Sequence, residues 1–498
     1  MEIFRHILDI INYIFMAILG LGFLPQIIYV LLFFLKPKRY PKAKEFHKVA
    51  IFIPARNESA TISNTVKSMF MQNYPSDKFA VYVVADNCSD NTAELAREAG
   101  ARVFERFDNE RRSRGWALDY GTKLALEEDP DIEFFVMFDA DNVAHCDYLS
   151  KMNDAFESGV EFARGYSNSK NIDYNTASAI SGIYYLRDSR LCCQSRSALG
   201  LDQQLMGPGM MVTAEFIKEK GFDAHSISED AEFTYNRMLE GKRTKYVDEA
   251  MYYEEQPTNM KDVFNRNIRF GYGLNKLFYN HGFRMLGKFF TTGRLSFIDM
   301  FLQLMFIPIA MICCIWIPLY YGYTFIEAIV MSDTSALHTW LSVAGIAISC
   351  IFYIPFVLQA LFVVLLERKK LKCKPSKLIF ACLVFPLYMI VYMLSIAIGT
   401  FSRKPKWKQI NHHVNVDLDS FLGKDAGVSS EMQVASDLVS SDDENQTLSD
   451  ELKDSALDLT QNIDDEMPSN TDEMELPDDN AEQVDEKEIL QKQEMKVK

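Results

Sequence analysis

Four long apolar segments constrain this chain of 498 residues more than any other feature. They occupy residues 7–35, 297–330, 340–366 and 378–401. About 20 apolar residues in a helix span the ~30 Å hydrocarbon core of a bilayer, and each segment is at least that long. A cleaved signal peptide is the alternative for the first segment, but that apolar run is too long and no small-residue cleavage site follows it. We therefore expect a multi-pass integral membrane protein with a soluble region between the first two segments.

Basic side chains beside the apolar segments predict their orientation. Five of them directly follow the first segment, at Lys36, Lys38, Arg39, Lys42 and Lys44. Because Lys and Arg concentrate on the cytosolic side of membrane segments, the soluble region is expected in the cytosol. The connection 332–338 lacks Lys and Arg and is expected outside, whereas the basic connection 367–377 is expected inside.

The last apolar segment conflicts with this orientation. If every segment crosses once, the basic side chains Arg403, Lys404, Lys406 and Lys408 lie outside, against the rule that places such residues in the cytosol. A hairpin or a re-entrant stretch within 297–330 would return the chain to the cytosol. We favour this solution and a cytosolic C-terminal tail.

Composition divides the chain into six parts. Basic and apolar side chains alternate in the part after the soluble region, which is typical of helices that lie on a membrane surface. The last part is rich in Asp, Glu, Ser, Asn and Gln and cannot bury enough apolar surface to fold. The parts are an N-terminal membrane helix with its basic flank (1–45), a soluble domain (46–257), amphipathic interfacial helices (258–295), C-terminal membrane helices (296–402), a basic and aromatic juxtamembrane segment (403–427) and an acidic disordered tail (428–498).

The soluble domain alternates short β-rich runs with helical patterns. The β-rich runs are 49–53, 80–85, 102–104, 133–138 and 162–165, and the helical patterns fill 60–71, 92–99 and 116–127. Strand–helix alternation predicts an α/β domain of the Rossmann-like kind, with a mostly parallel sheet covered on both faces. Functional loops are then expected at the carboxyl ends of the strands.

Charge and cysteine usage exclude other classes of protein. The net charge of −16 belongs to the acidic tail, and the rest of the chain is close to neutral. No basic stripe with interleaved aromatic residues is present, which argues against nucleic acid as a partner. None of the nine cysteines forms a CxxC pair, so reduced and mostly buried thiols are expected rather than a disulfide framework or a zinc site.

The strongest chemical signal is a pair of carboxylates, Asp139 and Asp141, directly after the strand 133–137. With one residue between them, both can face a cation at the end of that strand. Mg²⁺ and Mn²⁺ prefer such oxygen ligands, often together with the phosphate oxygens of a substrate. A metal ion held there would neutralise a diphosphate leaving group. A structural turn is the alternative.

Three further stretches place polar groups where a nucleotide would lie. The first strand ends at Ala55, followed by Arg56 and Glu58, and the second ends at Asp86. These residues are expected to hold a base and ribose, although turns and helix caps explain the stretch after Asp86 equally well. Arg114 begins a helical run, where a cation suits a pyrophosphate, and a solvated basic loop is the alternative.

Glu229 and Asp230 begin the helical run 231–240. An acidic helix start favoured by the helix dipole is one explanation. The other is a general base, because an acceptor hydroxyl that attacks an anomeric carbon must lose its proton to a group within hydrogen-bond reach. Gly207 and Gly209 flank Pro208 in a tight turn that we expect before another strand.

The order of these motifs resembles the membrane-bound family 2 glycosyltransferases, which include cellulose, chitin, hyaluronan and poly-N-acetylglucosamine synthases. The resemblance extends over residues 49–413 and implies a GT-A fold in the plasma membrane. It implies inverting transfer from a nucleotide sugar, most often a UDP-sugar, with Asp230 as the general base, Glu229 beside it, and Mg²⁺ or Mn²⁺ at Asp139 and Asp141. Gly207 and Gly209 resemble the loop beneath the acceptor.

One motif departs from the family pattern. Processive members carry Q(Q/R)xRW on an interfacial helix, where this chain has the stretch from Arg266 through Arg269 to Phe270. Arg269 can still hold a diphosphate, and Phe270 can still stack on a sugar but lacks the indole donor. The acceptor is therefore either a growing polysaccharide or a membrane lipid that receives a single sugar. A catalytically inactive transport or scaffold protein is the third possibility.

Overall fold

The computed structural model describes residues 2–332, 334–403 and 416–422, which belong to a single structural unit. The soluble domain and the apolar helices can therefore be described together. The acidic tail 428–498 and most of the juxtamembrane segment 403–427 lie outside the described residues.

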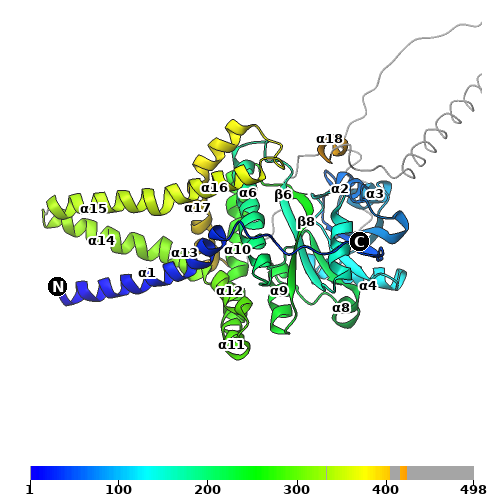
Figure 1. The fold of residues 1–498 in the computed structure, drawn as a ribbon, viewed down its shortest axis with the longest axis horizontal. Coiled ribbons are helices and arrows are strands. Elements are labelled where there is room, and N and C mark those ends of the chain that lie inside the picture. Colours follow the sequence, from blue (N-terminus) through cyan, green and yellow to red (C-terminus); the bar gives the residue numbers. More distant parts are fainter. Residues whose placement is uncertain (1, 333, 404–415, 423–498) are drawn as a thin grey trace, which may run out of the picture. The chain divides into compact units, whose positions relative to one another are not determined.

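An eight-stranded sheet forms the centre of the soluble domain (Figure 1). The strands are β1 (Val49–Ala55), β2 (Phe79–Asp86), β3 (Arg102–Arg106), β4 (Phe134–Met137), β5 (Val143–Ala144), β6 (Phe162–Ser169), β7 (Met210–Thr213) and β8 (Thr244–Glu254). Their order in the sheet is β3-β2-β1-β4-β7-β6-β8-β5. The expected α/β domain is present, and its first four strands are parallel.

The second half of the sheet is mixed rather than parallel, because β7 runs antiparallel to both β4 and β6. After β6 the chain leaves the sheet and re-enters it at the carboxyl end of β4, where Met210 pairs with Met137. This re-entry places the turn that contains Gly207 and Gly209 at the same sheet edge as the loop after β4.

Helices cover both faces of the sheet, and the alternation of side chains along β1 shows why. Ile51 and Ile53 pack on one face with helices α2 (Ile62–Phe70), α3 (Thr92–Glu98) and α5 (Tyr148–Glu157). Ala50 and Phe52 pack on the other face with α4 (Arg114–Glu128), α8 (Ala214–Lys220) and α9 (Glu229–Leu239). A short turn of helix, η1 (Ser76–Lys78), precedes β2.

Two groups of helices lie between the sheet and the apolar helices. The first group follows β6 and consists of α6 (Thr176–Arg187), η2 (Asp188–Cys193) and α7 (Gln194–Ala198). The second group follows β8 and consists of α10 (Met260–Leu277), η3 (Phe278–Gly282) and α11 (Phe283–Thr292). A hydrophobic cluster joins both groups to the apolar helices, with Ile183 and Val263 packed together with Ala360 and Phe385. The two regions therefore share a core.

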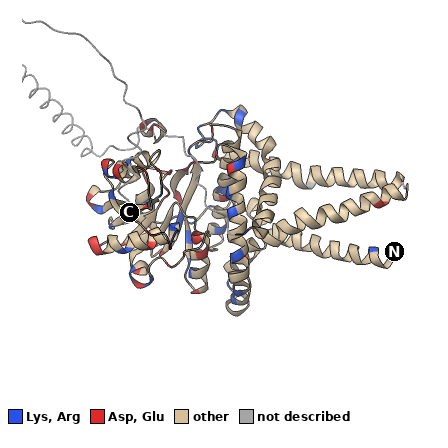
Figure 2. Ribbon diagram, turned by 180° about the vertical axis from the view of Figure 1, so that it is seen from behind, with Lys and Arg blue, Asp and Glu red and all other residues tan. Residues whose placement is uncertain are grey.

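Four helices of the described chain are long and apolar enough to cross a membrane. The first is α1 (Glu2–Leu31), and the fourth is α17 (Pro375–Phe401). The second consists of α12 (Leu295–Leu304), α13 (Phe306–Met311), η4 (Ile312–Trp316) and α14 (Ile317–Val330) in succession. The third consists of α15 (Thr334–Ile346), η5 (Ala347–Tyr353) and α16 (Ile354–Glu367) in succession. Figure 2 shows almost no charged residues along the helices that extend away from the sheet. The hairpin expected within 297–330 is wrong, because residues Leu295–Val330 form one long helical stretch.

The helix α17 differs from the other three, because it packs along α10 and α6 and its central stretch is more than half buried. Near its first turn, Lys377 donates to the backbone oxygen of Asp173 at 2.5 Å. At its last turn, Asn275 at the end of α10 donates to the backbone oxygen of Thr400 at 3.3 Å. One end of α17 thus contacts the loop after β6, and the other contacts the end of α10. Figure 1 shows α17 beside α10 and α6.

The short helix α18 (Leu418–Leu422) lies against the soluble domain. The side-chain amide of Asn64 in α2 donates to the backbone oxygen of Val416 at 3.0 Å. The ring of Phe421 contacts that of Tyr253 at a centroid distance of 4.8 Å. The described residues after α17 therefore lie on the same side as the sheet.

Candidate active site

Arg114 connects three segments that are far apart in the sequence. Its guanidinium donates from Nε to Asp139 at 2.8 Å, from one terminal nitrogen to Glu229 at 3.2 Å, and from the other to the backbone oxygen of Gly207 at 2.9 Å. Arg114 is the first residue of α4, whose N-cap Ser113 accepts from a backbone N–H of the first turn. The position of the helix start therefore fixes the position of the guanidinium.

The turn after β4 holds the two carboxylates that the sequence predicts as metal ligands. Asn142 fixes this turn from both sides, because its Oδ1 accepts from the backbone N–H of Asp139 at 2.7 Å and its Nδ2 donates to Asp141 at 3.1 Å. Asn142 itself is buried. The amide thus orients both carboxylates, and it does so without adding a charge.

Asp230 lies across the cavity from this turn, at the start of α9. Its Oδ2 accepts from the backbone N–H of Gly207 at 3.1 Å, and its Oδ1 accepts from the backbone N–H of Ala231 at 2.7 Å. Burial raises the pKa of the Asp230 carboxyl above its ordinary value. Burial, together with the nearby charge of Asp230, raises the pKa of Glu229 to about 7. Two carboxyl groups with raised pKa values therefore stand side by side at the helix start.

The two glycines of the loop below Asp230 are constrained to different degrees. A Cβ at Gly207 would lie 3.2 Å from the guanidinium of Arg114. Gly209 has a φ of +66°, and a Cβ there would lie 2.2 Å from the ring of Tyr252. The backbone N–H of Gly209 also donates to the oxygen of Met137 at 2.7 Å, which ties the loop to the end of β4.

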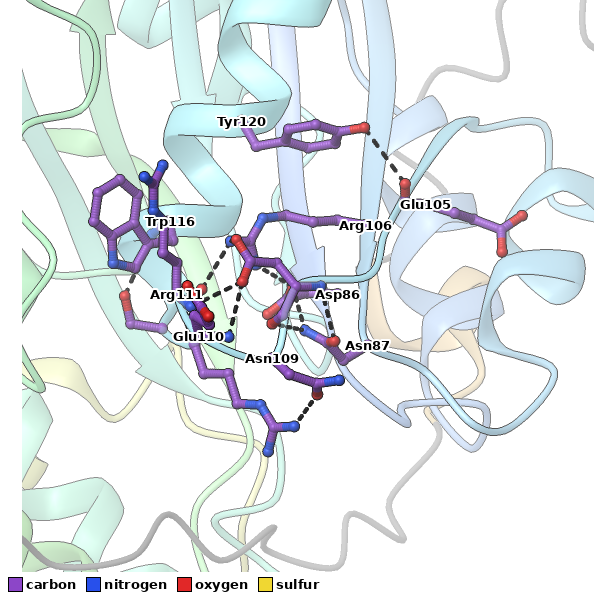
Figure 3. A network of polar contacts seen from close by, with 12 residues as sticks. Asp86, Asn87, Glu105, Arg106, Asn109, Glu110, Arg111, Trp116 and Tyr120 are labelled. Atoms are coloured by element: carbon purple, nitrogen blue, oxygen red, sulfur yellow. Dashed lines mark hydrogen bonds and ion pairs between the residues drawn. The ribbon is translucent and has the colours of Figure 1, made fainter.

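Asp86, predicted to hold a base, is bound to a cation that the sequence did not reveal. Its Oδ1 accepts from Arg106 at 2.6 Å and from the side-chain amide of Asn87 at 2.9 Å (Figure 3). Asp86 and Arg106 are both buried. Arg106 ends β3, which pairs in parallel with β2, so that only the sheet register brings the two residues together.

The loops after β1 and β2 are fastened to each other. The backbone N–H of Glu58 donates to Thr92 Oγ1 at 2.8 Å, and that of Ser89 donates to Asn57 Oδ1 at 2.8 Å. Asn57 and Asn87 both have positive φ angles, of 57° and 53°, which asparagine tolerates better than most residues. Ala55, Arg56 and Glu58 consequently face the same cavity as Asp86.

The motif on α10 reaches the same cavity from the membrane side. Arg266 donates to Gln256 and to Ser181, both at 3.2 Å, and its guanidinium stacks over the ring of Tyr185 at 5.3 Å. Arg269 is largely buried, and this burial lowers the pKa of its guanidinium. Phe270 lines the cavity with part of its ring exposed. Arg269 and the two residues that depart from the family pattern, Arg266 and Phe270, thus line the same cavity as the two acidic motifs.

Glu254 at the end of β8 is a site residue that the sequence analysis missed. Its carboxylate accepts from Ser167 at 2.8 Å. Burial, together with the negative charges of Asp141 and Asp139, raises its pKa to about 7. The three carboxylates line one cavity, but their oxygen atoms do not all lie within 4.8 Å of one another. As hard oxygen donors they match Mg²⁺ or Mn²⁺ in chemical type, and phosphate oxygens of a donor would complete such a site. The only signal of Glu254 in the sequence is that it is an acidic residue at the end of a strand.

All but one of the predicted site residues line a single cavity. They are Ala55, Arg56, Glu58, Asp86, Arg114, Asp139, Asp141, Gly207, Glu229, Asp230, Arg266, Arg269 and Phe270. Gly209 does not line the cavity, but its backbone N–H holds the loop to the end of β4. The cavity has a volume of about 2900 Å³ and continues between the apolar helices.

Comparison with known proteins identifies the soluble domain. Residues 47–273 match the model of the family described as glycosyltransferase like family 2. The chain carries a family 2 glycosyltransferase domain. This transferase domain has the GT-A fold, with its acidic motifs at the carboxyl ends of β4 and at the start of α9.

The transferase domain also accounts for the similarity to individual proteins. A probable glycosyltransferase of Bacillus subtilis is 25% identical over 48% of this chain and 57% of its own length. A β-monoglucosyldiacylglycerol synthase of Trichormus variabilis is 25% identical over 48% of this chain and 52% of its own length. The chain thus spans about half the length of these curated relatives.

A solved mannosyltransferase of Pyrobaculum calidifontis, in complex with GDP-Man and Mn²⁺, is 17% identical over 76% of this chain and 99% of its own. The TM-score is 0.47.

Proposed function

We propose that this protein transfers a sugar, with inversion, from a nucleotide sugar to an acceptor at the membrane. The single observation that carries the proposal is the position of Arg114, which joins the carboxylate pair after β4 to the acidic start of α9 within one cavity. A cation fixed between Asp139 and Glu229 lies where the diphosphate of a donor would meet the base. An inactive scaffold has no need for this arrangement.

The donor end is formed by the loops after β1 and β2. Asp86, held by Arg106, presents its carboxylate to the base, and Arg56 and Glu58 reach the base or the ribose. A UDP-sugar is the donor that we propose. We propose that Arg114, Arg266 and Arg269 hold its diphosphate.

Asp139 and Asp141, with Glu254 beside them, would hold Mg²⁺ or Mn²⁺. When bound, this ion supplies positive charge to the diphosphate that departs. Side chains and backbone groups of the protein carry out the proton transfer. Asp230 accepts the proton of the acceptor hydroxyl as the oxygen attacks the anomeric carbon, and the bond from that carbon to the diphosphate breaks on the opposite face. Backbone N–H groups of Gly207 and Ala231 hold the carboxylate of Asp230 in place.

The acceptor is either a growing saccharide or a membrane lipid. A relative named as a monoglucosyldiacylglycerol synthase supports the lipid, and the changed motif at Arg266 and Phe270 supports it as well. We place the protein in the plasma membrane with its transferase domain in the cytosol.

The proposal is tested with the full chain in nanodiscs and a panel of labelled nucleotide sugars in the presence of Mn²⁺ or Mg²⁺. We expect release of the nucleoside diphosphate from one donor. Asp141→Ala should weaken nucleotide binding in the presence of metal at least tenfold and leave binding without metal unchanged. Calorimetric titration measures both affinities.

The exposed Asp131→Asn substitution serves as a control and should bind as the unmodified chain does. Equal affinities of the Asp141→Ala variant and the unmodified chain, with and without metal, would refute the metal site. Failure to use any donor would favour the inactive scaffold instead.

A further inference from the structure

The cavity is much larger than a nucleotide sugar requires. Pockets for small ligands commonly have volumes of ~300–1,000 Å³. The cavity here has a volume of about 2900 Å³ and extends beyond Arg269 and Phe270 into the apolar helices. Most of its volume therefore lies outside the donor site.

The extension is lined by apolar side chains of three membrane helices and of α17. They include Leu19, Phe23, Val343, Ile348, Leu358 and Met393. Along α1 the apolar lining runs from Met16 to the polar Gln26, and at 1.5 Å per residue this is about 15 Å, half of the ~30 Å hydrocarbon thickness of a bilayer. The extension thus has the polarity and the length of one leaflet.

The walls of the extension are open at the side. Val343, Ile348 and Leu358 line it and are nevertheless 57%, 64% and 59% exposed. Around a membrane helix, exposed apolar side chains contact lipid. The extension is therefore continuous with the bilayer, whereas a conduit that carries a hydroxyl-rich polymer must be closed against lipid and must supply hydrogen-bond partners along its length.

A polar band separates the apolar extension from the catalytic end. Arg187 at the end of α6 donates to Gln26 of α1 at 2.5 Å, and both residues line the cavity. Its neighbours Arg164 and Arg196 are paired with carboxylates, but Arg187 forms no ion pair with any carboxylate in the described part of the chain. Its Nε is buried without a hydrogen-bond partner. The band suits the oxygen atoms of a lipid head group, which supply the missing acceptor.

We infer that the acceptor is a membrane lipid whose hydrocarbon chain occupies the apolar extension, entering sideways between α1 and the α15–α16 stretch. This inference rests on the proposed function, because it names the acceptor of the same site. The hydroxyl or phosphate oxygen of the head group reaches Asp230, forms the bond to the anomeric carbon and passes its proton, where it has one, to that carboxylate. The nucleoside diphosphate leaves, and the glycosylated lipid returns to the bilayer by the same side opening.

Gly20 provides a way to block the extension without disturbing the fold. It lines the cavity in the middle of α1, and a Cβ there would have no neighbour within 4 Å. Gly345 in α15 is a matched control, because a Cβ there is equally free but the residue does not line the cavity. Gly20→Phe and Gly345→Phe therefore add the same ring to two exposed helix positions, one inside the extension and one outside.

The first measurement is transfer by the full chain in phosphatidylcholine nanodiscs that contain either dioleoylglycerol or a polyprenyl phosphate. Gly20→Phe should lower kcat/KM for the lipid at least tenfold, and Gly345→Phe should stay within twofold of the unmodified chain. Nucleotide affinity should be the same in all three. The two lipids distinguish a hydroxyl head group from a phosphate head group. A polymer ladder without a lipid-linked product, or equal activities of the two variants, overturns the inference.

The second measurement does not depend on catalysis. A photoactivatable long-chain lipid should crosslink to peptides of α1 and α15 in a saturable manner in the unmodified chain and in Gly345→Phe, and this labelling should be lost in Gly20→Phe. Labelling without sugar transfer would leave the lipid site standing and refute the proposed function. Absence of saturable labelling in these helices overturns the lipid site, whether or not sugar is transferred.

Discussion

At the scale of single residues, the site is organised by contacts between charges at the cavity wall. Arg114 contacts the partly exposed Asp139 and the buried Glu229, and Asp230 is held by two backbone N–H groups. A cation beside a buried carboxylate lowers the cost of burying that carboxylate, so that the motifs stabilise one another. The same contacts prepare the cavity for a charged donor.

Asp230→Asn tests the proposed base. An amide of the same shape cannot accept the proton of the hydroxyl, and its NH2 group gives up one of the two bonds that Asp230 accepts from backbone N–H groups. We therefore expect kcat to fall by about 10²–10⁴-fold. Nucleotide affinity should not change, because Asp230 lies on the acceptor side of Arg114. Turnover and calorimetric binding measure the two effects. Near-normal turnover of the variant would show that another group takes the proton.

The pH dependence of the reaction reports the same carboxylate. Burial raises the pKa of Asp230, and the base works only when it is deprotonated. Activity should therefore be lost as the pH falls through a value above the ordinary 3.8 of an aspartic acid. Glu229→Gln removes a neighbouring negative charge and should shift this acid limb of kcat/KM to lower pH. A limb that stays in place or moves to higher pH would contradict the coupling of the two groups.

At the scale of elements, the contact between α10 and α17 holds the membrane side of the site in place. Gly271 and Gly399 meet at the crossing, where a Cβ on Gly399 would lie 2.4 Å from the backbone oxygen of Ile268 and a Cβ on Gly271 would lie 2.6 Å from that of Ile396. Only glycine permits this approach. Because α10 carries Arg266 and Arg269, the crossing also fixes the position of both cations.

Gly399→Ala should separate the two helices. A methyl group that close to a backbone oxygen forces a shift, and overpacking of this kind costs about 1–3 kcal/mol. We expect a lower Tm of the purified chain, measured by intrinsic fluorescence during heating. Gly345→Ala, whose Cβ has no neighbour within 4 Å, is the control and should not lower the Tm. Equal Tm values for the two variants would argue against a close crossing.

At the scale of the whole molecule, the ends of α17 resolve the conflict between the basic residues after it and the number of apolar segments. Lys377 near its start contacts Asp173 after β6, Thr400 near its end contacts Asn275 of α10, and Val416 binds α2. We propose that α17 lies along the membrane surface rather than across it. Three crossings then leave the residues after α17 in the cytosol, as the positive-inside rule requires.

Reporter fusions test this topology. Green fluorescent protein fused after residue 422 should fluoresce, and alkaline phosphatase at the same position should be inactive, because the fusion point is cytosolic. Fusions after residue 332 should give the reverse result, since the connection between α14 and α15 lies outside. Active phosphatase after residue 422 would mean that α17 crosses the membrane.

The sequence by itself determined the fold class of the soluble domain and the positions of the apolar helices, and it predicted the candidate site. Apolar length marked the four apolar helices, strand–helix alternation marked the transferase domain, and Asp139, Asp141 and Asp230 stood at the ends of elements. These features are local, because they depend on side-chain polarity and on spacing along the chain.

Only the tertiary structure decided which of these parts meet. The pairing of Asp86 with Arg106 depends on the register of β2 and β3. The position of Glu254 beside the carboxylate pair depends on the pairing of β8 with β5, two strands that are far apart in the sequence. The apolar helix α17 lies along α10 because two glycines allow close contact, which no count of apolar residues reveals. Long-range contacts such as these arise from packing, and packing is a property of the folded chain as a whole.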